Sequence, residues 1–418
     1  MSLLTGLRRL SRSLPIGQPV LHRLRGLAGL AFRFSAWARY GRTRRAARPA
    51  PGPICVVGFH GSVLGIGEAA RSVSSALRLA GAEVIDWDIS PLFGHDLRLD
   101  GGYQTDVPQE AGAMLIFLNP RELVQLMAMT GGAPFKDRFC AGCWAWELES
   151  APRSWRAGMG YVDEVWACSR FVANAVAVRA PPGLPIRVLP HPMSAKGALP
   201  DRTAFGLPEG AVAVLTAFDV RSGFERKNPL GAVRAFRQAN AGGAAVMICK
   251  AAGVEGAPEQ VAELRSEIGA AGDVRLMDEW LTGARMSALV ASCDIVLSLH
   301  RSEGFGLLPA QAMAMGKAVV ATGWSGNLEF MTTADSALVD YSLTPVRDPQ
   351  GLYGAGYWAS PDEGDAAAKL GRLIHDQEAR TALGARAAAA IAEKLDPLRL
   401  GRTALSWLGQ DRFGQNGQ

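Results

Sequence analysis

The sequence has few cysteines, few aromatic residues and no long uncharged apolar run. Its 418 residues include six cysteines, too sparse for a disulfide framework, so we expect reduced thiols. No stretch of about eighteen uncharged apolar residues occurs, which excludes a conventional membrane-spanning helix. With 48% hydrophobic and 20% charged residues, the chain has the composition of a soluble globular protein, and its length predicts two domains.

Residues 1–50 contain no carboxylate but eleven arginines. The rest of the chain carries 33 basic and 39 acidic groups, so the net charge of +5 comes from this arm. Leu, Phe and Trp interleave with the arginines at spacings near three and four, which predicts a cationic amphipathic helix. We expect it to bind an anionic membrane surface. A solvated arm and a helix packed on the body are alternatives, whereas the acidic body argues against nucleic acid, and the interrupting arginines argue against a signal peptide.

A proline-rich stretch separates the arm from the body. Residues 49–53 read Pro-Ala-Pro-Gly-Pro, which neither continues a helix nor joins a sheet. Beyond it, short apolar runs alternate with segments of helical spacing, the pattern of a parallel sheet, and Ser169 is placed to cap a helix. The expected strands are 54–58, 82–87, 114–118, 140–146 and 162–167. Residues 51–195 are therefore predicted to form a Rossmann-like domain.

A second alternating unit follows an irregular, proline-bearing connection at 181–208. Its expected strands are 211–218, 244–249, 274–277, 294–299, 318–321 and 337–339. Residues 196–395 are predicted to form a second Rossmann-like domain, and residues 396–418 a C-terminal helix and tail. The fold class is therefore α/β, with two Rossmann-like domains that face each other across a cleft where ligands bind at the carboxyl ends of the strands.

The segment 300–322 carries the most chemical information. Strand 294–299 leads into a glycine-bearing turn, Gly304-Phe305-Gly306-Leu307, and a helix begins near Gly306. Unpaired backbone N–H groups and the positive helix end suit an anionic group there. Just before the turn, the Glu303 carboxylate is placed to accept hydrogen bonds from sugar hydroxyls. One helix turn further on, Gln311 is a polar side chain on an otherwise apolar face, so it needs a partner.

This segment resembles the signature of the retaining GT-B glycosyltransferases of family four, which use nucleotide sugars. The family pattern has a Glu, then Gly-Phe-Gly-Leu, and a second Glu eight residues after the first. Gln311 stands at that second position, so the resemblance implies that it contacts the ribose, but without a charge-assisted hydrogen bond. Residues 218–229 resemble the family's donor-diphosphate loop, and the match implies that Arg221 and Lys227 bind the diphosphate. Cations there stabilise the departing nucleoside diphosphate.

Two further segments in the first domain resemble this family, and the second of them, residues 144–149, resembles its bacterial polysaccharide-type branch. Residues 60–71 resemble its glycine-rich first loop, with Gly65 and Gly67 allowing close backbone approach and His60 as a candidate acceptor contact. A nicotinamide-binding loop is the alternative for these glycines. Residues 144–149 carry Glu147 at a strand end, either to orient an acceptor hydroxyl or simply to pair with an arginine.

Three features suggest metal or other chemistry but are interpreted as structural. Asp86-Trp-Asp88 has the spacing of a metal-binding pair, yet it ends a strand of the first domain. Cys140 and Cys143 have one zinc-like spacing and no second pair. Hydrolase and phosphate-loop motifs are absent from the sequence. No metal and no cofactor besides the donor substrate are expected.

The resemblance implies a metal-independent retaining hexosyltransferase. It would move a sugar from a GDP- or UDP-linked donor to an acceptor hydroxyl, which we expect to be lipid-linked, in polysaccharide or glycolipid synthesis. Together with the basic arm, this implies a cytoplasmic protein, peripheral at the inner face of the plasma membrane. Two alternatives remain: a non-catalytic sugar-nucleotide sensor or scaffold, motivated by Gln311, and a nucleotide-sugar 2-epimerase.

Overall fold

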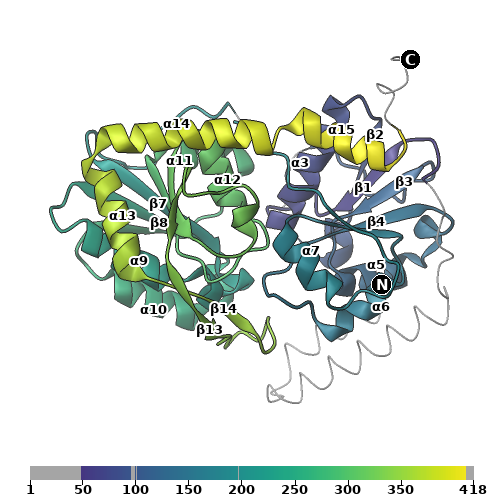
Figure 1. Cartoon of the computed structure of the whole chain (residues 1–418), viewed down its shortest axis with the longest axis horizontal. Helices are drawn as coiled ribbons and strands as arrows, with labels where there is room; N and C mark the ends of the chain where they lie inside the picture. Colours follow the sequence, from purple (N-terminus) through teal and green to yellow (C-terminus); the bar gives the residue numbers. More distant parts are fainter. Residues whose placement is uncertain (1–48, 96–98, 100, 196, 411–418) are drawn as a thin grey trace.

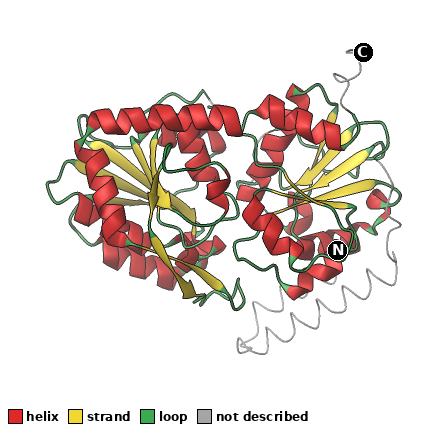
Figure 2. Ribbon diagram, in the orientation of Figure 1, coloured by secondary structure: helices red, strands yellow, loops and turns green. Residues whose placement is uncertain are grey.

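The computed structural model describes residues 49–95, 99, 101–195 and 197–410, which fold into two α/β domains (Figure 1). Nearly all of the arm predicted at 1–50 lies outside these residues. Figure 2 shows a central sheet in each domain with helices packed around it. Within the described residues, no helix combines the length and the apolar character needed to span a bilayer.

The first domain is built on a six-stranded parallel sheet with the order β2-β1-β3-β4-β5-β6. Its elements are β1 Ile54–Gly58, α3 Gly65–Leu79, β2 Val84–Asp88, α4 Ser90–Phe93, β3 Ala113–Ile116, α5 Pro120–Thr130, β4 Phe139–Trp144, α6 Arg156–Met159, β5 Glu164–Ala167, α7 Arg170–Ala177 and β6 Ile186–Val188. Strands β1, β3 and β4 are buried along their whole length, as expected for a parallel sheet covered on both faces.

The second domain repeats this plan with the sheet order β12-β11-β10-β7-β8-β9. Its elements up to β12 are β7 Val212–Asp219, the 3-10 turn η3 Val220–Ser222, α8 Phe224–Lys227, α9 Pro229–Ala239, β8 Ala245–Ala252, α10 Pro258–Ile268, β9 Val274–Met277, α11 Gly283–Ser292, β10 Ile295–Ser298, α12 Leu307–Ala314, β11 Ala318–Thr322, the 3-10 turn η5 Gly326–Glu329 and β12 Ala337–Val339. In both sheets, strand order reverses beside the first strand of the domain, which is where such sheets bind ligands.

Most elements fall where the apolar pattern predicts them, and the two-domain α/β fold is confirmed. Ser169 caps α7 as expected, because its hydroxyl oxygen accepts a hydrogen bond from the Val172 N–H at 3.2 Å. Two features were missed. One is the edge strand β6, and the other is an antiparallel hairpin of β13 Tyr341–Pro345 and β14 Tyr357–Pro361. Both include or adjoin prolines, which weaken a strand pattern.

The C-terminal helices return the chain to the first domain. Helix α13 Glu363–His375 packs on the second domain, α14 Gln377–Lys394 runs toward the first, and α15 Pro397–Trp407 lies against α3 (Figure 1). The Trp407 ring contacts Trp166 with centroids 5.0 Å apart. Helices α13 to α15 therefore help to hold the two domains together.

The contact between α15 and α3 is tight at Gly401, where a Cβ atom would collide with the backbone oxygen of Ala76. Gly401→Ala is therefore expected to lower the free energy of unfolding by about 1–3 kcal/mol through overpacking. Urea unfolding would measure the loss. Gly283→Ala is the matched control, since a Cβ there meets no atom within 4 Å. Equal stability of both variants would contradict the packing described.

Candidate functional site

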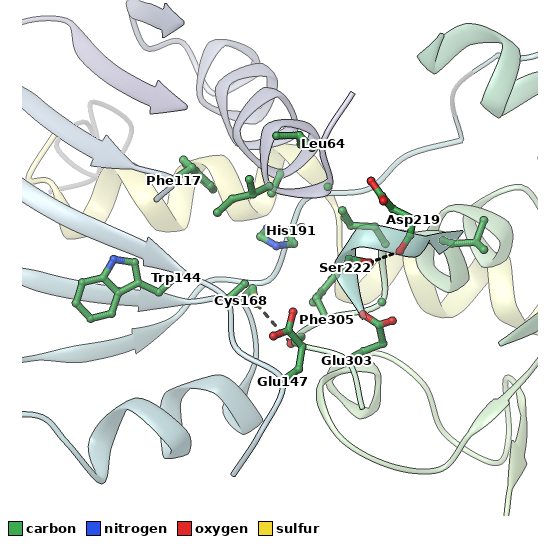
Figure 3. Close-up of a pocket in the computed structure, with 18 of the residues that line it drawn as sticks. Leu64, Phe117, Trp144, Glu147, Cys168, His191, Asp219, Ser222, Glu303 and Phe305 are labelled. Atoms are coloured by element: carbon green, nitrogen blue, oxygen red, sulfur yellow. Dashed lines mark hydrogen bonds between the residues drawn. The ribbon is translucent and has the colours of Figure 1, made fainter. Parts of the chain in front are cut away.

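A cavity of about 550 Å³ lies between the two domains. The carboxyl ends of β4 and β5 and the start of α3 line it from the first domain, and the ends of β7 and β10, α8 and the start of α12 line it from the second. Figure 3 shows Glu147 and Glu303 reaching into it from opposite domains. The two-domain cleft predicted from the sequence is therefore present.

Two helices begin at this cavity without a side-chain cap. No side chain caps α3 after Leu64 or α12 after Gly306. A Cβ on Gly65 would lie 3.7 Å from the Leu307 side chain, so the two helix starts meet across the cleft. Gly306 has a φ of +96°, which favours glycine, and lets the chain turn into α12. Free N–H groups and two positive helix ends make this edge suitable for an anion.

The glycine turn also joins the domains. Ser169 of the first domain donates a hydrogen bond from its hydroxyl to the Gly304 carbonyl at 2.7 Å. The Arg170 N–H donates to the Glu329 carboxylate at 2.7 Å. These contacts hold the domains closed around the cavity. Electrostatic interactions between groups buried in such a cleft are stronger than in solvent.

A buried charge cluster lies on the second-domain side. Lys227 and Arg226 bind the same oxygen of Glu303, with N–O distances of 2.5 and 3.1 Å. Burial favours the neutral acid, but the two cations outweigh it and lower the pKa of Glu303 to about 2. Arg226 also donates to the Ser302 and Ser222 carbonyl oxygens at 2.7 and 2.8 Å. Arg226 is thus held by several partners, whereas among the residues that the structure describes the Lys227 ammonium bonds to Glu303 alone.

The structure brings Lys227 and Glu303 to the cavity but not Arg221. Arg221 makes a bidentate salt bridge to Asp219, at 3.0 and 2.7 Å, and lies over the Trp280 ring at 5.0 Å. The cavity is lined instead by Arg226, which is buried and was not singled out in the sequence. The sequence signal that could have identified Arg226 is that it directly precedes Lys227 in the short helix α8.

Gln311 does not line the cavity, although its sequence position predicts a ribose contact. Its Nε2 donates a hydrogen bond to the Ser287 hydroxyl of α11 at 2.8 Å. The partner that this polar side chain needs is therefore a neighbouring helix.

Gln311→Ala is expected to lower stability by about 1 kcal/mol, because the hydrogen bond to Ser287 is lost. Ser287→Ala should lose a similar amount, and the double variant little more, since both single changes break one contact. Denaturant unfolding of the three variants checks this. If the protein binds a nucleoside diphosphate, as the resemblance implies, its affinity is expected to stay unchanged in Gln311→Ala. A clear loss of that affinity would favour the ribose contact instead.

Of the site residues predicted in the first domain, some line the cavity and others do not. Gly65 and Glu147 line the cavity, together with Gly304, Phe305, Gly306 and Leu307 from the second domain. Gly67 and His60 do not. Gly67 packs against the Phe59 carbonyl, and His60 is buried with Nε2 2.9 Å from the Val56 carbonyl oxygen. Burial lowers the pKa of His60, which suits a neutral core histidine rather than an acceptor contact.

Two residues at the junction of the domains were missed by the sequence analysis. His191, in the connection after β6, lines the cavity and packs on Phe305 with ring centroids 4.7 Å apart. Burial lowers its pKa to about 4, so the imidazole is neutral at physiological pH. Tyr353, in the loop between β13 and β14, contacts Trp146 of the first domain at 5.5 Å. Neither belongs to a motif that a sequence pattern would reveal.

The features interpreted as structural have structural partners. Asp86 pairs with Arg78 at 2.8 Å, and Asp88 accepts hydrogen bonds from the N–H and hydroxyl of Ser90 at 3.0 and 2.6 Å. All six cysteines are buried and unpaired. Among the described residues, no group of three or more His, Cys, Asp or Glu side chains is placed to hold a metal ion.

Comparison with known proteins agrees with this geometry. Residues 223–357 match the family described as glycosyl transferases group 1. A search of curated protein sequences finds no match. The matched segment contains the α8 cations, the glycine turn and the β13–β14 loop, so the family match falls on the second-domain side of the cavity.

Several solved structures share the fold. HepE of Anabaena, in complex with UDP and glucose, is 14% identical over 86% of this chain and 100% of its own, with a TM-score of 0.60. Sucrose-phosphate synthase of Thermosynechococcus elongatus is 15% identical over 87% and 100%, with a TM-score of 0.61. A TarM variant of S. aureus, in complex with fondaparinux, alpha-GlcNAc-glycerol and UDP, is 12% identical over 71% and 55%, with a TM-score of 0.53.

The two domains and the cleft between them are those of the GT-B fold. Together with the glycosyl transferases group 1 segment, the fold supports a glycosyltransferase. The class of protein expected from the sequence, a glycosyltransferase, therefore agrees with the fold and the family match.

Proposed function

We propose that this protein transfers a hexose from a nucleotide diphosphate sugar to an acceptor hydroxyl with retention of the anomeric configuration. The observation that carries the proposal is the meeting of two uncapped helix starts, α3 and α12, beside Lys227 in one interdomain cavity. UDP is the first candidate nucleotide, because proteins of the same fold bind it, and GDP is the second.

Lys227 is proposed to change partners when the donor binds. Its Nζ is held by Glu303 at 2.5 Å, and its side chain is 21% exposed, so it can turn toward a diphosphate. Glu303 would then be free to accept hydrogen bonds from sugar hydroxyls, while Arg226 keeps it in place. The N–H groups at the start of α12 would bind the phosphate that departs. These groups stabilise charge that increases in the transition state.

Retention is proposed to follow from attack on the face that the diphosphate leaves. The departing phosphate oxygen would help to take the acceptor proton, so no protein nucleophile is assigned. Glu147 faces the cavity from the first domain and is the candidate group for orienting the acceptor hydroxyl. Domain closure would keep water from hydrolysing the donor.

The acceptor is proposed to be lipid-linked, in polysaccharide or glycolipid synthesis at the inner face of a membrane. The support is the arginine-rich, carboxylate-free sequence of residues 1–50 and the resemblance of residues 144–149 to a polysaccharide-type branch. Binding to vesicles with and without phosphatidylserine, compared for the full chain and for a variant starting at residue 49, tests the membrane part alone.

A thermal-shift panel followed by a turnover assay tests the proposed function. UDP, GDP and ADP and their glucose or mannose conjugates are the ligands, and one nucleotide is expected to raise the melting temperature, since it binds only the folded state. The same donor should then be hydrolysed or transferred. If no nucleotide diphosphate shifts the melting temperature, the proposal is wrong.

A sensor is the second candidate, because the structure places Gln311 on Ser287 rather than at the cavity. The two functions differ in turnover. Donor binding with neither hydrolysis nor transfer to any lipid-linked or saccharide acceptor would favour the sensor. Sugar release with retained configuration, followed by NMR, would favour the transferase.

A further inference from the structure

His191 lies in the connection that leads from β6 to the second domain, and the backbone is held on both sides of it. The Leu189 N–H donates a hydrogen bond to the Ala167 carbonyl oxygen at the end of β5, at 2.9 Å. The Met193 N–H donates to the Leu395 carbonyl oxygen just after α14, also at 2.9 Å. A proline flanks His191 on each side, which further restricts the backbone. The imidazole therefore extends from a fixed point of the chain.

The imidazole of His191 lines the interdomain cavity but has an unsatisfied nitrogen. The residue is only 9% exposed, and its ring packs edge-on against Phe305, with centroids 4.7 Å apart. Figure 3 shows it among the side chains of both domains that surround the cavity. Within the described part of the chain, Nδ1 is buried without a hydrogen-bond partner. Such a group is costly to the folded state, so its presence in a cavity wall indicates a ligand that bonds to it.

The surroundings of His191 indicate which part of a nucleotide sugar it would meet. Among the described residues, the cations that line the cavity are Arg226 and Lys227, both from the second domain. The phosphates are proposed to bind there and at the start of α12. Phe305, on which the His191 ring packs, lies between Glu303, the proposed sugar contact, and that helix start. Because burial lowers the pKa of His191 to about 4, the ring is neutral and suits a sugar hydroxyl better than a phosphate.

We propose that His191 forms a hydrogen bond with a hydroxyl of the transferred sugar and thereby determines which donor sugar is accepted. This inference rests on the proposed function and deepens it. One nitrogen of a neutral imidazole donates and the other accepts, so the ring can bond to a hydroxyl in either sense. The imidazole gains in the complex the partner that it lacks in the free protein. A sugar without that hydroxyl leaves the nitrogen unpaired and is rejected.

The test combines His191→Phe, in the full chain, with donors that lack single hydroxyls. The probes are UDP-glucose and GDP-mannose, each with its set of monodeoxy analogues, and hydrolysis is measured so that water is the acceptor. Wild type is expected to lose at least about tenfold in kcat/KM on one deoxy analogue. His191→Phe should lose a similar factor on the parent donor and little more on that analogue, since both changes remove the same contact.

Stability separates this role from a structural one. His191→Phe keeps a ring of similar size against Phe305 and breaks no hydrogen bond of Nδ1, so its melting temperature is expected to equal or exceed that of wild type. His60→Phe is the control, because the Nδ1 of His60 is also buried without a partner among the described residues, but His60 does not line the cavity. It is expected to keep the kcat/KM of wild type.

Three results would overturn the inference. They are unimpaired hydrolysis by His191→Phe, an equal further loss on every deoxy analogue, and a loss of activity that accompanies a lower melting temperature. A loss of transfer to octyl glucoside with unchanged hydrolysis would assign His191 to the acceptor and also contradict it. A wild-type protein that neither hydrolyses nor transfers contradicts the proposed function as well, whereas an active wild type with unimpaired His191→Phe contradicts this inference alone.

Discussion

Lys227→Met is expected to lower kcat/KM for the donor by about 10²–10³-fold, the cost of removing one preorganised charge from a developing anion. The physical reason is that Lys227 lines the cavity and, within the described part of the chain, its ammonium bonds only to Glu303, the contact that we propose a phosphate replaces. Most of the loss should appear in kcat, because the diphosphate gains negative charge as the sugar bond breaks. Steady-state kinetics with a UDP-sugar measures both parameters.

Two comparisons sharpen this expectation. Lys369→Met is the matched control, since Lys369 pairs with Asp365 at 2.6 Å and does not line the cavity. Arg221→Ala separates the sequence interpretation from the structural one, because Arg221 is bound to Asp219 and does not line the cavity. If Arg221→Ala loses as much turnover as Lys227→Met, the diphosphate lies nearer Arg221 and the placement proposed for it is wrong.

Glu303→Gln is expected to destabilise the protein by about 3–5 kcal/mol, because it leaves the buried Arg226 and the partly buried Lys227 without their carboxylate. A nucleoside diphosphate should restore part of this loss, since it brings anionic charge to the same cations. UDP is therefore expected to raise the melting temperature of Glu303→Gln more than that of the wild type. A loss of stability below 1 kcal/mol at neutral pH would contradict the charge cluster as described.

The effect of Glu303→Gln should also depend on pH in a defined direction. The folded pKa of Glu303 is about 2, below the ordinary value of 4.5, so its ion pairs stabilise the fold fully above pH 4.5. The contribution is lost as the pH falls toward 2. The stability difference between wild type and Glu303→Gln is expected to shrink by about 1 kcal/mol between pH 7 and pH 3.5. Urea unfolding at both pH values measures it.

The fold follows from features that a sequence displays directly. Buried parallel strands are continuous apolar runs, and 54–58, 274–277 and 337–339 coincide with β1, β9 and β12. The hairpin of β13 and β14 was not predicted, because its exposed tyrosines, prolines and polar residues lack the period of a buried strand. The loop of this hairpin carries Tyr353, which contacts Trp146 of the first domain. Tertiary packing, and not the local sequence, decides this contact.

The candidate site was predictable only where a motif fixes the backbone. The glycine turn and Glu303 lie at the cavity because strand β10 and the start of α12 place them there. Arg221 and Arg226 lie on the same short segment, and the choice between them depends on which one Asp219 binds. The position of the Gln311 side chain likewise depends on its hydrogen bond to Ser287 on a neighbouring helix. A local sequence pattern does not show which side chains will become partners in the folded protein.

The structure of the complex with UDP tests the central claim most directly. The account predicts that the diphosphate lies in the interdomain cavity, within hydrogen-bonding distance of Lys227 Nζ and of the N–H groups at the start of α12. It also predicts that Glu303 then no longer binds Lys227. UDP bound outside this cavity, or with its phosphates on Arg221 while the contact between Lys227 and Glu303 stays intact, would contradict the account.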